Sequence, residues 1–452
     1  MTVRAAALAL AALAIAAPAA HATQTTQTFR YGPITIGAYG VDERDYVAGM
    51  PGPRVDGYLT GGSARLVDAQ GRPVSAARVM LHHLLFSNAG TRLGEKSNPL
   101  CDRVTLFDSR SQVPGLSEPF SGFAEEHADE NLPPGYGYPI EAGDEWVGTW
   151  MFMNHSNRPQ TVFIEYSASV VTGETLKPAY PLWLDVGGCS LDPIFDVPGG
   201  GRPGSTFSRT TTVPAPFTGR IVAALGHLHG GGKSVVLSEP ACGDRELLRS
   251  LPTWASPRSM VYRMRPVLHE PSPYGMSTVT SQRGWAVRAG EPLKVTVDYD
   301  DALAHTRVMG ILGLYISPDP PAAAAECPPL PTDVQVHRIP GPSDPPAFHL
   351  PVPRPPGPTV RLGRGATIDV ARQSFAPANV AVRRGTVVRW RFWDDDLHNV
   401  TVADGPRGFS SPNLSDGRDY EQRLTRPGVY RLVCSLHPAT MTATVTVLAR
   451  RR

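Results

Sequence analysis

The sequence predicts an all-β protein with two tandem jelly-roll-like β-sandwiches followed by a third, Greek-key sandwich. Short runs of β-branched and aromatic residues, such as 146–153 and 293–299, are separated by turn residues, and long helical patterns are scarce. The chain has 44 glycines and 46 prolines among 452 residues, which favours many turns without reaching a disordered composition. At about 150 residues per domain, the length predicts roughly three domains.

Residues 1–22 predict a signal peptide. Arg4 supplies a short positive region, residues 5–17 are apolar, and Ala20-His21-Ala22 is a small-x-small cleavage site before Thr23. No later apolar run approaches membrane-spanning length. The charge is nearly balanced, with 43 Lys and Arg against 41 Asp and Glu, so nothing points to a nucleic-acid partner. We expect an exported protein, periplasmic or secreted, with no membrane span.

Composition divides the rest of the chain. A Gly/Pro-rich stretch at 197–204 lies near the middle of the long β-rich region and marks a boundary there. Fifteen prolines between residues 318 and 358 predict a semi-extended linker, in which His337 and His349 should be exposed. The expected parts are a first sandwich at 23–195, a second at 196–318, a linker at 319–358 and a last domain at 359–452.

Three side chains with metal-binding chemistry lie in one short loop near the C-terminus: Cys434, His437 and Met441. His398 lies upstream, on a separate strand-like run. Two His, one Cys and a weak axial Met are the ligand set of a blue-copper electron-transfer site. The alternative is a buried structural Cys beside two surface histidines.

The region around these residues, roughly 360–448, resembles the cupredoxins, especially the plastocyanin and pseudoazurin type. The segments 367–370, 375–377 and 380–390 are similar to the opening strands of such a domain. The resemblance implies a type 1 copper held by His398, Cys434, His437 and Met441. Three residues separate His437 from Met441, where close relatives have two or four, so a core role for Met441 stays open.

Four histidine motifs stand out in the large upstream region. His227 and His229 are two apart on a predicted strand, so both side chains should point to one face and could chelate a metal. His82 and His83 are adjacent, so binding one ion would require a β-bulge or a strand end between them. His155 alone also fits a hydrogen-bonded core histidine. The fourth motif, His305 to Met309, contains a methionine that also fits the core.

In this order the motifs resemble the copper type II, ascorbate-dependent monooxygenases, such as the peptidylglycine hydroxylating enzymes, and the related stress-up-regulated nodulin family. The resemblance rests on the segments 82–86 and 227–232 and covers roughly residues 30–318. It implies two further mononuclear coppers separated by a cleft for a small-molecule or peptide substrate. One would be held by His82, His83 and His155, and the other by His227, His229 and Met309. Ser87 and Asn88 stand where the enzymes usually have a cysteine.

Other candidate residues have simpler interpretations. His127 follows two glutamates and is expected to be solvated in a charged loop. His269 and Met276 could approach the second copper, although a structural role is the simpler expectation. His305 could be an extra ligand or a hydrogen-bond donor behind the ligands.

The five cysteines fit one copper ligand and two disulfides. With Cys434 on copper, four remain, and three pairings are possible in an oxidising compartment. Cys189 lies just before the second predicted sandwich and Cys327 just after it, so a bond between them would tie its two ends together. That pairing leaves Cys101 with Cys242.

The leading hypothesis is an exported multi-copper oxidoreductase. In it, a copper-dependent monooxygenase-like module receives single electrons from the fused cupredoxin, which is supplied by a redox protein or a small reductant. One alternative is a non-catalytic copper-binding or electron-carrier protein, and another is an adhesion protein with a vestigial metal site.

Overall fold

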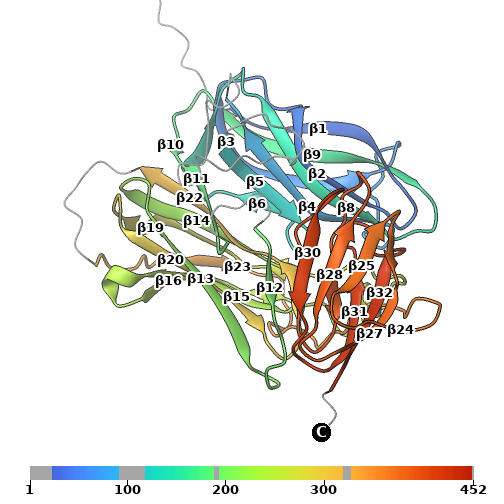
Figure 1. Ribbon diagram of the computed structural model, residues 1–452. Helices are drawn as coiled ribbons and strands as arrows, with labels where there is room; N and C mark the ends of the chain where they lie inside the picture. Colours follow the sequence, from blue (N-terminus) through green and yellow to red (C-terminus); the bar gives the residue numbers. More distant parts are fainter. Residues whose placement is uncertain (1–22, 91–117, 188–192, 319–326, 450–452) are drawn as a thin grey trace, which may run out of the picture.

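The computed structural model describes residues 23–90, 118–187, 193–318 and 327–449, so the predicted signal peptide, Cys101 and Cys189 lie outside it. The all-β prediction is confirmed, since these residues form several packed sheets (Figure 1). The helices within these ranges are two single 3-10 turns, η1 (Pro240–Cys242) and η2 (Met260–Tyr262), and neither could cross a membrane.

The first hydrophobic core lies between a six-stranded and a four-stranded sheet. Aromatic side chains fill it, and Phe120 stacks on Tyr138 with ring centroids 5.4 Å apart. The larger sheet contains β1 (Thr23–Ile36), β9 (Gln160–Thr172), β3 (Gly57–Val67), β7 (Tyr136–Ile140) and β10 (Lys177–Pro178), with β6 (Asp129–Asn131) beside β3. The smaller contains β2 (Val41–Met50), β8 (Trp146–Asn154), β4 (Val79–Asn88) and β5 (Glu118–Ala124).

The second core lies between a five-stranded and a four-stranded sheet. The five-stranded sheet contains β11 (Tyr180–Asp185), β22 (Gly310–Pro318), β14 (Gly219–Leu228), β19 (Thr278–Val287) and β23 (Gln335–His337). The four-stranded sheet contains β13 (Thr206–Pro214), β20 (Pro292–Asp300), β15 (Gly232–Glu239) and β16 (Arg245–Ser250). Two small pairs accompany them: β12 (Phe195–Val197) with β21 (His305–Val308), and β17 (Pro252–Thr253) with β18 (Gly275–Met276).

Residue alternation explains these strands. In β20, Leu293, Val295 and Val297 are buried, and the residues between them are only partly buried, the period-2 pattern of a strand with one face in a core. Strand β11 pairs along β22, and its leucines lie in the second core. The chain therefore leaves the first core before residue 180, ahead of the division expected at 195.

The C-terminal core is enclosed by a five-stranded and a four-stranded sheet, in orange and red in Figure 1. One contains β24 (Val360–Arg361), β27 (Asn379–Arg383), β32 (Thr442–Leu448), β31 (Gly428–Val433) and β29 (Thr401–Asp404). The other contains β26 (Ser374–Ala376), β25 (Ala366–Ala371), β28 (Val387–Phe392) and β30 (Asp419–Arg423).

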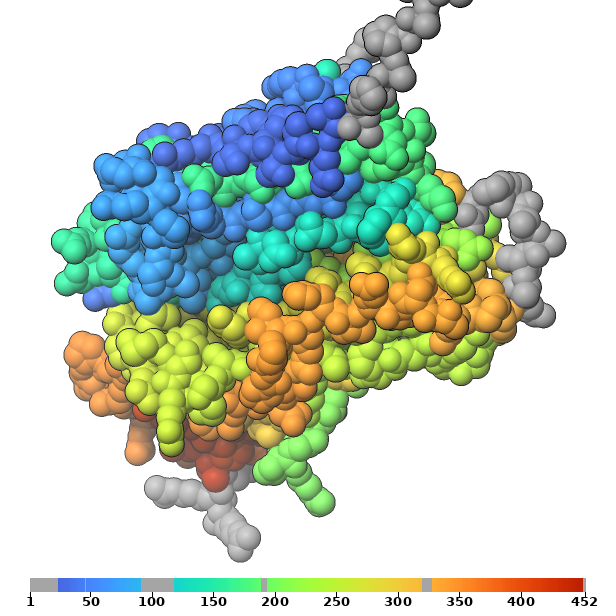
Figure 2. Space-filling model, turned by 180° about the vertical axis from the view of Figure 1, so that it is seen from behind, coloured from blue at the N-terminus to red at the C-terminus, as the bar shows by residue number. Residues whose placement is uncertain are grey.

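The proline-rich linker does not run free of the domains. Strand β23 extends the second sandwich by pairing with β19, and the N–H of Trp254 donates to the carbonyl of Pro342 at 2.9 Å. At the other end, the side chain of Asn379 donates to the carbonyl of Pro355. The segment lies along the surface of the upstream module (Figure 2, orange). Proline has no backbone N–H but keeps its carbonyl oxygen, so donors on neighbouring segments hydrogen-bond to the linker. His337 and His349 are exposed, as expected.

The disulfide prediction is wrong for Cys242 and Cys327, which are bonded to each other with Cα atoms 5.8 Å apart. Cys327 was expected to bond to Cys189 and so tie the two ends of the second sandwich together. Instead, Asp333 accepts hydrogen bonds from the side chain of Ser281 and the N–H of Arg283. These bonds and β23 hold the segment after Cys327 on the second sandwich, which also carries Cys242 in η1.

Candidate metal centres

His398, Cys434 and His437 meet in the C-terminal sandwich, with one donor atom of each within 4.8 Å of the others. The Nδ1 atoms of the two histidines are 3.2 Å apart, and Cys434 Sγ lies 3.6 Å from His437 Nδ1. His398 Nε2 hydrogen-bonds Asp394 Oδ2 at 3.3 Å, which favours the tautomer that leaves Nδ1 free for a metal. Burial raises the pKa of the Cys434 thiol, so a bound cation must replace its proton. The set fits copper, which binds thiolate and imidazole.

The ligand loop joins β31 to β32. The N–H of His437 donates to the carbonyl of Cys434 at 3.0 Å, and the N–H of Met441 donates to the carbonyl of His437 at 2.9 Å. Met441 is fully buried in the same core as Cys434. Its axial role stays a prediction.

Asn399, which the sequence analysis did not single out, ties the loop to the strand of His398. Its N–H donates to Cys434 Sγ at 3.3 Å, which favours the thiolate. Its side chain donates to the hydroxyl of Ser435 at 2.7 Å and accepts from the N–H of Ser435 at 2.9 Å. The signal that could have revealed it is an amide directly after the ligand histidine.

A second histidine cluster lies between the first two sandwiches. The register of β4 against β8 shifts between Leu81 and His83, the kind of irregularity that binding one ion with both adjacent histidines would require. The rings of His82 and His83 are 5.4 Å apart, centroid to centroid. Burial, followed by the charge of His227, lowers the pKa of His82 to about 4, so its imidazole is neutral and able to bind a metal.

His227 and His229 point to one face, as expected. Their Nε2 atoms are 3.1 Å apart at the end of β14. The N–H of His229 donates to the hydroxyl of Tyr299 at 3.0 Å, and that hydroxyl donates to the carbonyl of Met309. Tyr299 therefore joins the backbones of two expected ligands of the second copper.

Two glutamates of the charged loop before His127 point into this cluster. Glu125 Oε1 lies 2.8 Å from His82 Nδ1, and the carboxylate of Glu126 pairs with His227 Nδ1. The expectation for this loop is wrong, because Glu126 is buried and His127 is partly buried. Ala124 and His127 exchange backbone hydrogen bonds across a tight turn whose tip is Glu125 and Glu126. Burial raises the pKa of Glu125 to about 7.

Residues expected to hold two coppers on opposite sides of a cleft lie close together instead. His82, from the expected first site, and His229, from the second, have ring centroids only 5.0 Å apart. The two sandwiches meet here, so His82 and His83 of the first and His227 and His229 of the second enter one cluster. His155 is partly buried, and neither of its ring nitrogens has a hydrogen-bond partner among the described residues.

His269 also joins the cluster, whereas the simpler expectation had been a structural role. Its ring centroid lies 4.7 Å from that of His82, and its Nε2 lies 2.9 Å from Met80 Sδ. Met276, considered with it, lies in the second hydrophobic core instead.

Comparison with known proteins identifies the C-terminal part. A family model described as copper binding proteins, plastocyanin/azurin family, matches residues 365–448. These residues form a cupredoxin domain. Amicyanin-alpha from Methylorubrum extorquens is 27% identical over 74 residues, which are 16% of this chain and 62% of that protein, so less than two thirds of that relative is spanned.

Two solved structures match about the same share of this chain as amicyanin-alpha does. An oxidised amicyanin variant is 23% identical and covers 19% of this chain and 82% of its own, with a TM-score of 0.18. A purple cupredoxin from Nitrosopumilus maritimus is 29% identical and covers 18% of this chain and 99% of its own, with a TM-score of 0.17. The monooxygenase resemblance of residues 30–318 stays a prediction.

A cavity of about 110 Å³ lies where the two sandwiches and the cupredoxin domain meet. Such a volume holds several water molecules or a small ligand. Val433 and Ser435, which flank Cys434, line it together with members of the histidine cluster. The lining from the upstream sandwiches includes His82, His83, His229, His269 and Met309.

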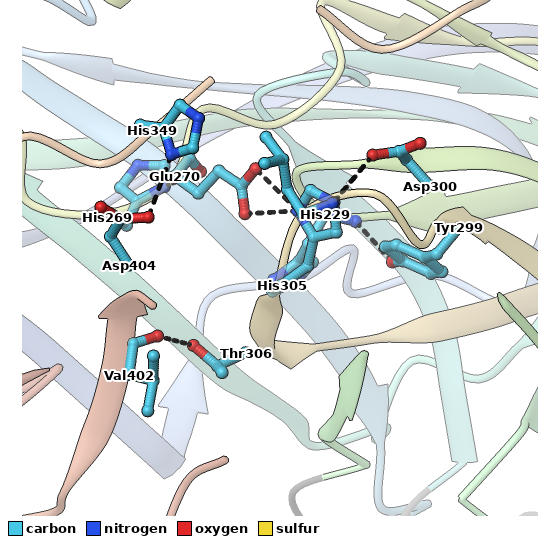
Figure 3. Close-up of polar contacts among 11 residues, drawn as sticks. His229, His269, Glu270, Tyr299, Asp300, His305, Thr306, His349, Val402 and Asp404 are labelled. Carbon is cyan, nitrogen blue, oxygen red and sulfur yellow. Dashed lines mark hydrogen bonds and ion pairs between the residues drawn. The ribbon is translucent and has the colours of Figure 1, made fainter. Parts of the chain in front are cut away.

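Strand β21 holds the cupredoxin domain against the second sandwich. The hydroxyl of Thr306 donates to the carbonyl of Val402 at 2.7 Å, and the guanidinium of Arg307 donates to the carbonyl of Ser411 at 3.0 Å (Figure 3 shows the first). Asp196 accepts from the N–H groups of Ser410 at 2.7 Å and Arg307 at 3.0 Å. These bonds fix the cupredoxin domain next to the cavity.

His305 precedes Thr306 and is buried between two carboxylates (Figure 3). Its Nδ1 lies 2.8 Å from Glu270 and its Nε2 lies 3.8 Å from Asp300. Burial by itself lowers the pKa of His305, but the charges of Glu270 and Asp300 outweigh it and raise that pKa to about 9. A Cβ atom at Gly231 would lie 2.3 Å from the His305 ring, which explains a glycine in the run after His229. The sequence expectation of a supporting residue fits this position better than a metal ligand.

Proposed function

We propose that this chain is an exported multi-copper redox protein, in which the type 1 copper of the cupredoxin domain exchanges single electrons with a copper-dependent, monooxygenase-like centre in the histidine cluster. The observation that carries the proposal is the shared cavity, because the residues on both sides of Cys434 and the clustered histidines line the same space. A fused electron carrier at this position acts at a fixed, high effective concentration.

A short path through the protein supports the electron exchange. Thr401 pairs with Val433, the residue before Cys434, across β29 and β31. The next residue of β29, Val402, accepts the hydrogen bond from Thr306, which follows His305 in the upstream module. The route from thiolate to module thus consists of covalent bonds, the pairing of β31 with β29, and one hydrogen bond at the interface.

The donor set of the cluster suits a redox metal. Neutral, buried imidazoles are ligands that copper favours, and burial, followed by neighbouring histidine charges, lowers the pKa of His229 well below its usual value. Met309 lines the cavity and offers a thioether that favours Cu(I). Copper bound by these side chains would supply one-electron redox chemistry and oxygen activation. Monooxygenation uses two electrons and two protons per O₂, forming one hydroxylated product and one water.

Export is part of the proposal. Residues 1–22 carry the features of a signal peptide, with Thr23 the residue after the expected cleavage site. N-terminal sequencing of protein recovered outside the cytoplasm should read Thr-Gln-Thr. Recovery of uncleaved protein from the cytoplasm alone would contradict export.

The function is tested on the full chain loaded with copper, by reductant-driven oxygen consumption and absorption spectra. Wild type should consume oxygen. His229→Ala should lose that activity while keeping the blue band, and Cys434→Ser should lose the band and slow the activity. His349→Ala, at an exposed histidine, is the matched control and should resemble wild type.

Two results would contradict the proposal. Full oxygen consumption in Cys434→Ser would show that the cupredoxin domain does not supply the electrons. Copper in both centres without oxygen consumption for any reductant would favour the non-catalytic copper-binding or electron-carrier alternative.

A further inference from the structure

We propose that His82, Glu125 and His269 form a metal site that joins the first two sandwiches and takes a divalent first-row transition metal ion, with Met80 as a weak additional donor. The inference deepens the proposed function, because it names ligands that the monooxygenase resemblance did not supply. Glu125, His269 and Met80 all lie outside that predicted ligand set.

The proposed metal site consists of donor atoms that carry lone pairs and face each other. One donor atom each of His82, Glu125 and His269 lies within 4.8 Å of the other two. Glu125 Oε1 is 2.8 Å from His82 Nδ1 and 3.4 Å from His269 Nε2. These separations are similar to the 3.2 Å and 3.6 Å between donor atoms in the cupredoxin site.

The tautomer of His269 is the second observation. Its Nδ1 lies 2.6 Å from the carbonyl oxygen of Glu270, which can only accept, so Nδ1 carries the proton. Its Nε2 is then a bare lone pair, and its neighbours are a carboxylate oxygen of Glu125 and, at 2.9 Å, the sulfur of Met80. Acceptors that face one another in a buried site need either a shared proton or a cation between them, and a bound metal ion takes the place of the proton. A backbone carbonyl behind the ligand histidine is also the usual support for a metal-bound imidazole.

The surroundings suit a dry, fixed site. His82 and Met80 are buried, and both lie beside His269, whose ring centroid is 4.7 Å from that of His82 and whose Nε2 is 2.9 Å from the Met80 sulfur. Apolar side chains including Met153 and Leu268 pack around Met80. His82 and Glu125 belong to the first sandwich and His269 to the second, so a bound ion would hold the two together. Two imidazoles and one carboxylate suit iron(II), copper(II) or zinc(II), and copper(II) should bind most tightly.

The test uses the full chain, stripped of metal and titrated with copper(II) ions, with the blue band of the cupredoxin site as an internal check of folding. Wild type should bind copper beyond the type 1 ion, with a separate EPR signal and a higher thermal midpoint of the upstream module. Glu125→Gln, which keeps the side-chain shape, should weaken this copper roughly a hundredfold, and His269→Ala should remove it along with the thermal shift. Met80→Leu should have a small effect.

Matched controls are Glu246→Gln and His349→Ala, whose side chains are exposed, and both should bind copper as wild type does. Wild-type binding and EPR in both Glu125→Gln and His269→Ala would overturn the site. So would loss of the signal in His83→Ala or His155→Ala but not in Glu125→Gln, because that result returns the ion to the ligands expected from the resemblance. If the site binds copper as described but no oxygen is consumed, the site stands and the monooxygenase proposal fails.

Discussion

Replacing Glu270 with glutamine tests whether the buried charge of His305 stabilises the fold. The pKa of His305 rises from 6.5 to about 9 on folding, and at about 1.4 kcal/mol per tenfold change in proton affinity this corresponds to about 3 kcal/mol. Because the folded-state pKa is the higher one, this contribution is fully present below pH 6.5 and is lost as the pH rises through about 9. Glu270→Gln should remove most of it.

The assay is equilibrium urea unfolding of the metal-free chain at pH 6 and pH 9.5. The variant should be less stable than wild type by about 3 kcal/mol at pH 6, with a much smaller difference at pH 9.5. Glu246→Gln is the matched control, since the exposed pair of Glu246 with Arg249 should change stability by about 0.5 kcal/mol at most. An equal loss at both pH values would refute the reasoning, because it would assign the effect to packing instead of charge.

Three further predictions concern the cupredoxin site and the disulfide. Cys434→Ser and His398→Ala should each abolish the intense visible band without unfolding the domain, and a variant that stays blue would refute that ligand assignment. Met441→Leu should keep the band and shift the reduction potential measured by voltammetry, because an axial thioether is a weak ligand; an unchanged potential would indicate a three-ligand site. Replacing Cys242 and Cys327 with serine opens a loop of 85 residues, so urea unfolding should show a loss of up to about 4.5 kcal/mol in the chain-entropy model. A loss below about 1 kcal/mol would mean that β23 alone holds this segment.

Local features of the sequence were enough to predict several parts of the protein. The alternation in β20 predicts a strand with one buried face, because side chains on a strand point to opposite faces in turn. The spacing of Cys434 and His437 predicts a ligand loop, since a tight turn brings both to one point. The adjacent pair His82-His83 showed that binding one ion would require a bulge or a strand end, and the register of β4 does shift there.

The contacts between domains were decided only by the tertiary structure. Nothing local to Glu125 or His269 shows that the loop of one sandwich faces the loop of another, because that depends on how two separately patterned sheets pack. The same holds for the disulfide of Cys242, whose partner is set by where β23 joins the sheet. Sequence periodicity encodes which face of an element is buried, but not against which partner. Hence the sequence predicted which residues of one domain meet as candidate copper ligands, and the packing of all three domains decided that the cupredoxin loop and the histidine cluster share one cavity.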